Sequence, residues 1–435
     1  MQKKQNIGLV WFRNDLRVSD NDVLHLATSN HEILIACYCF DPRHFENGTF
    51  GFKKTEKFRA KFLIDSVSDL KTSLKAMGIE LFIFLDKPEN SIPKLLEEWD
   101  ISKVYLQKEW TPEEGHVLNQ VKSRVSITIR FYESYTQFLY HPETIEMKIS
   151  EIPMVFTDFR KHVEKYARVR PLTAEPQYRS SKVVPNTTRI PTLADLGFQD
   201  FEQHPLSAFP FTGGERSAFQ RLNYYIFETK KLGVYKKTRN GLIGTNYSSK
   251  LSPWLANGSL SVRTVYWNVK RFEEEHEKNQ STYWLIFELI WRDYFKYVSL
   301  KYGNSIFHLR GIRNREYEWE RDVREINNWI NGKTGSSFVN ANMLELQQTG
   351  WMSNRGRQNV ASYFSKDMRL DWRIGASYFE SLLIDYDVHS NYGNWMYVSG
   401  VGNDPRDRKF DVEWQANRYD PSGKFQNLWL QPTLF

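Results

Sequence analysis

Five short apolar runs in the first third of the chain are separated by longer amphipathic stretches. The runs are three to eight residues long and carry strand-type side chains, which is typical of buried strands. The segment 55–77, by contrast, has the pattern of a helix. Because strands and helices alternate, the pattern predicts a parallel α/β sheet. The expected strands are 7–12, 33–40, 81–85, 104–106 and 127–131.

The pattern changes in the second half of the chain. Residues 171–210 contain six prolines and little periodicity, which marks a long connection. From Glu215 onward apolar residues recur every three or four positions, as they do around Trp284, and no strand run is evident. The prediction is an α/β domain over 1–132, an interdomain linker over 133–205 and an all-α domain over 206–435.

Composition narrows the class of protein. Of the 435 residues, 26% are charged and 40% are hydrophobic, which excludes a disordered chain and a disulfide scaffold. The run 33–40 is too short to span a bilayer, and Met1–Lys4 lead directly into the first strand, so we expect no membrane segment, no targeting segment and a cytoplasmic location. Cys37 and Cys39 alternate within an apolar run, which favours a buried strand in a reducing compartment over a disulfide or metal site.

The net charge of +7 comes from the second half. Residues 1–205 hold 28 Lys and Arg against 28 Asp and Glu, whereas residues 206–435 hold 31 against 24 and also 11 of the 14 tryptophans. Cationic and aromatic side chains gathered in this way suit a surface that stacks bases and holds phosphates. An ordinary basic exterior around a tryptophan-rich core is the alternative.

Several familiar motifs are absent or incomplete. Phe12–Asp15 follow the first strand where a G-x-G-x-x-G turn would be needed, so the sheet is Rossmann-like without the dinucleotide fingerprint. Gly332–Thr334 resemble the end of a P-loop, but Asn327 occupies the position of its first glycine. The sequence has no H-E-x-x-H motif and no paired C-x-x-C motifs, so we expect no metal site.

One segment has the features of an anion site. In 247–253, Ser252 stands directly before Pro253, which predicts an N-cap serine and a proline in the first helical position. Free N–H groups at a helix start, together with the preceding hydroxyls and Lys250, suit a pyrophosphate. An ordinary capped helix with exposed serines remains the alternative.

Charged residues also occur in apolar or aromatic surroundings. On the predicted helix 284–294, Glu288 and Arg292 are four residues apart, so an internal salt bridge between them is one interpretation and a functional pair is the other. Near the end, Asp385 and Asp387 precede a polar and aromatic cluster. They are candidates to bind a metal, to cap a turn, or to face Arg357 across a polar ring system.

Together these segments resemble the photolyase and cryptochrome superfamily, over essentially the whole chain and most closely in its cryptochrome DASH branch. The similarity begins at Trp11–Arg17 and ends at Leu428–Leu430. The motifs that carry it most specifically are Thr238–Gly241, Tyr247–Lys250, Phe287–Phe295 and Gly400–Arg406.

The resemblance implies a U-shaped FAD in the helical domain. Asn391 would face the flavin N5 atom, where an amide supports a reduced, repair-competent flavin. In the first domain, Glu109 would contact an antenna, 5,10-methenyltetrahydrofolate. The residues implied to hold FAD are Tyr235, Ser248, Ser249, Lys250, Leu251, Ser252, Glu288, Arg292, Asn354, Arg357, Asp385, Asp387 and Asn391.

The implied activity is blue-light-dependent repair of cyclobutane pyrimidine dimers by an electron from the excited, reduced flavin. The lesion is flipped from the base stack, as in photolyases generally. Glu288 would bind its pyrimidine edge between Trp291 and Tyr397, and Arg355 and Arg408 would hold flanking phosphates. Tyr397 replaces the tryptophan of duplex-active photolyases, which favours single-stranded DNA. The implied electron chain to the flavin is Trp395, Trp372 and Trp319.

Two other functions are compatible with the same residues. A blue-light receptor would use flavin photoreduction to change its partner binding, with little repair. An RNA- or DNA-binding module could retain flavin without photochemistry. In the leading interpretation the protein is a monomeric carbon–carbon lyase of the deoxyribodipyrimidine photo-lyase type.

Overall fold

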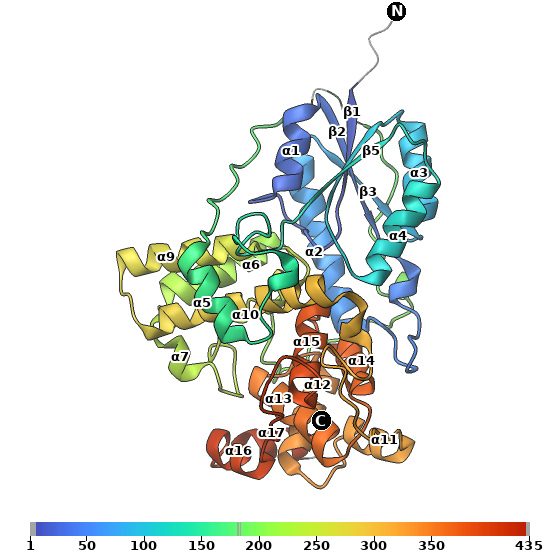
Figure 1. Cartoon of the computed structure of the whole chain (residues 1–435). Helices are drawn as coiled ribbons and strands as arrows, with labels where there is room; N and C mark the ends of the chain where they lie inside the picture. Colours follow the sequence, from blue (N-terminus) through green and yellow to red (C-terminus); the bar gives the residue numbers. More distant parts are fainter. Residues whose placement is uncertain (1–5, 181, 183, 432–435) are drawn as a thin grey trace, which may run out of the picture.

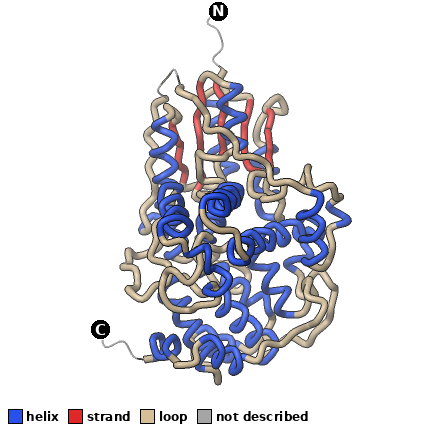
Figure 2. The backbone as a smooth tube through the Cα atoms, turned by 90° about the vertical axis from the view of Figure 1, so that its left-hand side faces the viewer, coloured by secondary structure: helices blue, strands red, loops and turns tan. Residues whose placement is uncertain are grey.

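The computed structural model describes residues 6–180, 182 and 184–431. The start of the chain, Met1–Lys4, on which we based the absence of a targeting segment, lies outside the described residues. A five-stranded sheet with its flanking helices forms the upper part of the molecule, and a larger helical assembly forms the lower part (Figure 1). Figure 2 shows the strands confined to one end. No helix in the described residues is both long enough and apolar enough to span a membrane.

The sheet is entirely parallel, in the order β3-β2-β1-β4-β5. Apolar side chains on one face pack against α1 and α2, and those on the other face pack against α3 and α4. This arrangement confirms the predicted α/β fold. The strands are β1 (Ile7–Trp11), β2 (Ile33–Cys39), β3 (Glu80–Phe84), β4 (Lys103–Gln107) and β5 (Arg130–Ser134). The helices are α1 (Asp22–Asn30), α2 (Lys57–Ala76), α3 (Pro88–Glu98) and α4 (Pro112–Ser123).

The fifth strand was predicted three residues too early. The chain pairs with β4 only from Arg130, which lies opposite Lys103, and Ile127 is fully exposed. At the edge of the sheet the strand is only partly buried, so its apolar pattern is weak and pairing with β4 sets its bounds.

The second half of the chain is helical, as predicted, and α10 runs through its centre. The predicted helix 284–294 is longer in the structure because Asn279 caps its start and Gly303, at φ +52°, ends it. The α-helices are α5 (Phe156–Tyr166), α6 (Glu215–Asn223), α7 (Tyr235–Thr238), α8 (Ser252–Ala256), α9 (Val262–Glu275), α10 (Gln280–Tyr302), α11 (Val323–Ile330), α12 (Ser337–Thr349), α13 (Asn354–Ser362), α14 (Trp372–Leu382), α15 (Val388–Ser399), α16 (Val412–Tyr419) and α17 (Lys424–Leu430).

The connection between the two parts is long and extended. Helix α5 packs on α10, with the Phe156 ring stacked on Trp291 at 3.7 Å. After α5, the described residues up to Gly214 contain only one short 3₁₀ turn, Ala194–Leu196. The prolines of this region account for the lack of regular structure, because proline cannot donate a backbone hydrogen bond.

Buried polar contacts fasten the two parts together. Asp20, 2% exposed, pairs at 2.7 Å with Arg263 at the start of α9. Arg17 donates to the backbone oxygens of Gly258 and Thr136. An unpaired buried charge costs on the order of 3–5 kcal/mol of free energy, so these contacts persist in the folded protein. They therefore hold the two parts, and the walls of any cavity between them, in one relative arrangement.

Candidate functional site

The main cavity of the helical part has a volume of about 440 Å³ and lies between α7, α10, α13 and the loop before α8. It gathers side chains separated by more than 160 positions in the sequence. A smaller cavity of about 80 Å³ adjoins it, shares Asp385 and Asp387 with it, and contains Asn391 and Trp395. The predicted residues that line the main cavity are Tyr235, Ser248, Ser249, Lys250, Leu251, Ser252, Glu288, Trp291, Arg292, Asn354, Arg355, Arg357, Asp385, Asp387 and Tyr397.

Ser252 does not cap its helix, contrary to the sequence prediction. It is the first residue of α8, Leu251 precedes the helix, and no side chain there caps the free amides. The Ser252 hydroxyl instead donates to Asp385 Oδ2 at 2.7 Å. Because Asp385 is an acceptor supplied by a distant segment, local sequence could not reveal this choice. The hydroxyl therefore joins the loop to the acidic side of the cavity.

Lys250 is buried, and among the residues that the structure describes its Nζ has no hydrogen-bond partner. Its backbone has φ +63°, and its Nζ lies 3.4 Å from the centre of the Tyr247 ring and 4.3 Å from that of Trp351. Burial lowers the Lys250 pKa well below its ordinary value, with nearby Glu345 opposing the shift. An anionic ligand in this cavity would supply the missing partner and favour the charged form of the amine.

The two acids near the end of the chain have different partners. Arg357 donates to both Asp385 oxygens at 2.9 and 3.0 Å, as one of the sequence alternatives proposed. Asp387 Oδ1 accepts from the Ser390 amide and caps α15, while Asp387 Oδ2 pairs with Lys296 Nζ at 2.9 Å. Lys296 and neighbouring cations hold the Asp387 pKa well below its ordinary value despite burial. Asp387 therefore caps a helix, and Asp385 faces an arginine.

Glu288 and Arg292 do not form the internal salt bridge that their spacing allowed. Glu288 pairs with Arg239 at 2.8 Å, and burial raises the Glu288 pKa against that attraction. Arg292 donates to the backbone oxygens of Gln137 and Leu255 at 2.7 and 2.9 Å. Since Arg239 lies 49 positions earlier, sequence spacing could not identify it, although the Thr238–Gly241 motif contained it.

Aromatic rings wall the cavity beside Glu288. Trp291 and Tyr397 meet edge to face with their centroids 6.0 Å apart. Phe156 supports the other side of Trp291. The arrangement offers a carboxylate next to two aromatic rings, which suits a flat, hydrogen-bonding ligand.

Of the three predicted tryptophans, Trp372 lies on α14, Trp395 lies on α15, and Trp319 lies in the segment before α11. A Cβ on Gly375 would be 2.3 Å from Trp395, so glycine allows α14, which begins at Trp372, to approach Trp395 closely. Trp319 precedes Glu320, which bridges to Leu370 just before α14. Trp329, which sequence reasoning did not select, also contacts Trp395, with centroids 6.3 Å apart.

The two predicted phosphate contacts differ in position. Arg355 lines the main cavity and donates to Asn240 and Gln415. Arg408 is not among the residues lining the main cavity and pairs with Asp404 at 3.0 Å, with its side chain 44% exposed. Only Arg355 is at the cavity itself.

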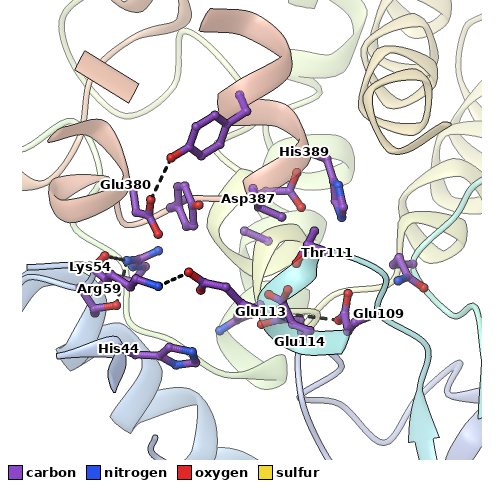
Figure 3. A pocket seen from close by; sticks show the side chains of 18 of the residues that line it. His44, Lys54, Arg59, Glu109, Thr111, Glu113, Glu114, Glu380, Asp387 and His389 are labelled. Carbon is purple, nitrogen blue, oxygen red and sulfur yellow. Dashed lines mark hydrogen bonds and ion pairs between the residues drawn. The ribbon is translucent and has the colours of Figure 1, made fainter. Parts of the chain in front are cut away.

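A second large cavity, of about 400 Å³, lies between the α/β part and the helical part (Figure 3). Glu109 lines it and accepts from Gln107 at 2.7 Å. Burial raises the pKa of Glu109, and it raises the pKa of Glu114 to about 7. Sequence reasoning missed Glu114, Arg59 and Glu380, because the cavity that they line exists only once the two parts have docked.

The two cavities share a wall. Ala256, Arg292 and Asp387 line both of them. Lys296 lines the interdomain cavity and bonds Asp387, so it holds this wall from behind. In the described parts of the chain, no group of three or more His, Cys, Asp or Glu side chains is placed to hold a metal ion.

Comparison with known proteins identifies the class first. A model of DNA photolyase matches residues 8–177, and a model of the FAD binding domain of DNA photolyase matches residues 284–434. The two matches define a protein of the photolyase class, with its α/β domain followed by a FAD-binding helical domain.

Individual relatives narrow the class. The chain is 47% identical over 427 residues to cryptochrome DASH of Xenopus laevis, covering 96% of this chain and 81% of the relative. It is 43% identical over 436 residues to the chloroplastic/mitochondrial cryptochrome DASH of Arabidopsis thaliana, covering 99% and 76%. The crystal structure of a Synechocystis cryptochrome superposes with a TM-score of 0.94 at 42% identity, covering 99% and 89%. The chain belongs to the cryptochrome DASH branch of the photolyase and cryptochrome superfamily.

The main cavity fits the FAD that this family's helical domain binds. The Lys250 amino group and the Ser248 and Ser249 hydroxyls are suited to phosphates, and Arg292 and Arg357 add two further cations to the lining. The adjoining small cavity provides further room beside Asn391. Asn391 donates its amide to the Ala376 oxygen at 3.0 Å, which fixes the orientation of its side chain.

Proposed function

We propose that this protein repairs cyclobutane pyrimidine dimers under blue light, preferentially in single-stranded DNA. The observation that carries the proposal is the half-buried Glu288 carboxylate, held by Arg239 and flanked by Trp291, in the cavity that fits FAD. Family membership supports it because photolyases act on bases flipped out of the stack. The protein would then be a carbon–carbon lyase.

The residues of the cavity have separate roles in this proposal. The chemistry that reduced FAD would supply here, once bound and excited by light, is the transfer of one electron to the dimer, which would return it after splitting, so no net redox change would occur. Glu288 hydrogen-bonds the pyrimidine edge, and Trp291 and Tyr397 exclude water around it. Asn391 would face the flavin N5 atom without adding a strong proton source, and Arg292, Arg357 and Lys250 would balance negative charge.

The preference for single strands follows from the cost of flipping. A dimer in a duplex must lose its pairing before it enters the cavity, whereas an unpaired dimer loses little. Tyr397 presents a smaller ring than tryptophan would, so it recovers less stacking energy from the flipped base. Arg355 and Arg408 would hold the flanking phosphates.

Two accessory parts complete the proposal. The interdomain cavity would hold 5,10-methenyltetrahydrofolate as an antenna, with Glu109 accepting hydrogen bonds from its ring. Trp395, Trp372 and Trp319 would carry electrons to the flavin during photoreduction; Gly375 and the bridge before α14 support this route.

The division at residues 132 and 205, a monomeric state and a cytoplasmic location remain predictions. Size-exclusion chromatography with light scattering tests the monomer. Fluorescence imaging of the tagged chain tests the location, for which the chloroplastic/mitochondrial Arabidopsis relative indicates the alternative.

The decisive experiment is illumination of the reduced holoprotein with an oligonucleotide that carries one thymine dimer. We expect light-dependent loss of the dimer, faster in a single strand than in the matching duplex. A light-induced change in protein association without dimer loss would contradict repair and favour a photoreceptor. Salt-dependent DNA binding without any photochemistry would favour a nucleic-acid-binding module.

A further inference from the structure

A chain of cationic and aromatic side chains leads from the main cavity to the outer surface of α16. The Arg355 guanidinium lines the cavity and lies 4.6 Å from the centre of the Tyr419 ring. Arg418 lies 5.8 Å from the same ring and 5.0 Å from the ring of Trp414. Helix α16 lies at the bottom of the molecule, below α13 (Figure 1). The side chains therefore form a continuous path away from the cavity.

Trp414 is a large ring held at the surface. It is 51% exposed, and in the part of the chain that the structure describes, Arg418 is the only cation over its ring, no aromatic ring pairs with it, and its indole N–H has no hydrogen-bond partner. The other strongly exposed tryptophan, Trp267, is 37% exposed and donates its indole N–H to the Arg170 oxygen at 3.0 Å. Trp414 has no such contact to explain its place, so its free face is available to a partner.

The charge along this path is uncompensated. No ion pair engages Arg355 or Arg418 among the described residues, whereas Arg239 pairs with Glu288. The pKa of Arg355 is lowered, first by burial and then by its cationic neighbours Arg239 and Arg418. Two guanidinium groups without an ion pair, both lying against the Tyr419 ring, favour an anion beside them.

The acids of the same region already have partners. Asp411 accepts from the Trp414 amide and caps α16. Asp420 accepts from the Phe425 and Gln426 amides, and Glu413 accepts from the Ser336 hydroxyl at 3.4 Å. They do not neutralise Arg355 or Arg418, so the surface complements a polyanion.

We propose that Trp414, Arg418, Tyr419 and Arg355 form a docking surface for the single strand that continues from the lesion. A base stacks on the free face of Trp414, and phosphates lie along Arg418 and Arg355. Alternating aromatic faces and cations suit unpaired bases. Bases of a duplex cannot reach the ring because they are stacked on one another. This inference rests on the proposed function and names the part of the DNA that α16 recognises.

The test measures how much affinity a flanking strand adds. Fluorescence anisotropy at fixed salt would give Kd for single-stranded oligonucleotides that carry one thymine dimer, with either long flanks or flanks trimmed to the dimer. Trp414→Ala should reduce the gain in affinity from the flank by roughly 5- to 150-fold, which is the range for loss of one base–aromatic stack. Trp414→Phe should keep most of it. Trp267→Ala is the matched control and should behave as wild type.

Salt dependence tests the cationic part. Arg418→Gln should lower the slope of log Kd against log salt by about 0.7, the value for one phosphate contact in a single strand. Bound flavin absorbance and the thermal midpoint should be the same in each variant as in wild type, because Trp414 and Arg418 are exposed.

The outcomes separate this inference from the repair function. If wild type repairs dimers but Trp414→Ala retains the full gain from the flank, the docking surface is wrong and the repair function stands. If wild type repairs nothing yet binds single strands through Trp414, the docking surface stands and the repair function is wrong. An unchanged salt slope in Arg418→Gln would also overturn the proposed phosphate contact.

Discussion

At the scale of single residues, ionisable groups in the cavities have strongly altered environments that their own sequence neighbours do not provide. Glu288 forms its ion pair with Arg239, which directly follows α7, and not with Arg292 on its own helix. Burial raises the Glu288 pKa, and Arg239 opposes this shift. Keeping the charged carboxylate in this position, ready for a ligand, therefore costs desolvation free energy. This cost indicates a role beyond stability.

Replacement of Glu288 by glutamine tests its role in lesion binding. Glu288→Gln keeps the shape but loses a charged hydrogen-bond acceptor, and hydrogen bonds to charged groups contribute about 1.5–3 kcal/mol. We expect repair of a single-stranded dimer to fall by roughly 10- to 150-fold, measured as kcat/KM under constant illumination. Flavin content is the control, and repair at the wild-type rate with full flavin would contradict the assignment.

The interdomain cavity should bind its ligand in a pH-dependent way. Burial, with a further contribution from Glu109, raises the Glu114 pKa to about 7, so this carboxyl is mostly neutral at pH 6 and mostly charged at pH 8. A folate carries negative carboxylates of its own, so its binding should weaken as pH rises through 7. At an effective dielectric constant near 20 the repulsion is on the order of 1–2 kcal/mol.

Titration of the purified protein with the folate, followed by its near-ultraviolet absorbance at pH 6 and pH 8, measures this effect. Glu114→Gln cannot ionise, so its affinity should differ little between the two pH values. Glu98→Gln, an exposed acid on α3, is the matched control and should keep the wild-type dependence. Equal pH dependence in wild type and Glu114→Gln would rule the explanation out.

At the scale of elements, α10 and α15 are joined by a buried ion pair behind the shared wall of the two cavities. Lys296 is 3% exposed and bonds Asp387, the residue that caps α15. Because Lys296 holds the Asp387 pKa well below its usual range, the pair stabilises the fold above the ordinary carboxyl pKa near 4. This contribution is lost as pH falls below that value.

Removal of one partner should cost more than removal of both. Asp387→Asn leaves the Lys296 ammonium buried and unpaired, which costs about 3–5 kcal/mol of unfolding free energy. The double variant Asp387→Asn with Lys296→Met should recover most of that loss. Urea unfolding at pH 7, with and without added FAD, measures both values. If the single and double variants are equally stable, the pair is not what secures α15.

At the scale of the whole molecule, the α/β part and the helical part meet through buried charges. Arg263 and Asp20 pair across the interface with 7% and 2% of their side chains exposed. The interdomain cavity depends on the docking of the two parts because residues of both parts line it. Docking of the two parts therefore creates the proposed antenna site.

Loss of this contact should loosen the interface. Arg263→Gln leaves Asp20 unpaired, which costs about 3–5 kcal/mol, and calorimetry should show an earlier and broader unfolding transition than in wild type. Arg310→Gln removes the ion pair with Glu316, in which both side chains are exposed (55% and 71%), so the loss should be less than about 1 kcal/mol. Equal losses in the two variants would contradict the role given to Arg263.

Local sequence features were sufficient for the central strands and the helical half. Runs such as 33–40 are apolar on both faces, because the strand they form is covered by helices on both sides. The edge strand was misplaced because partial burial leaves little pattern at Arg130–Ser134. The role of Ser252 was also wrong, because Asp385 lies 133 positions away and competes with the helix end for its hydroxyl.

The order of residues alone determined the α/β and helical parts, the excess of cations and tryptophans in the second half, and the motifs of the family. Each of these depends either on the residue pattern within one element or on residue counts along the chain, so none of them requires knowledge of the folded structure. Tertiary structure alone decided that Glu288 pairs with Arg239, that Lys296 secures Asp387, and that Arg355 in the cavity lies against Tyr419 of α16. These contacts join segments whose spacing in the chain carries no information about their distance in space, because packing of the whole core sets that distance.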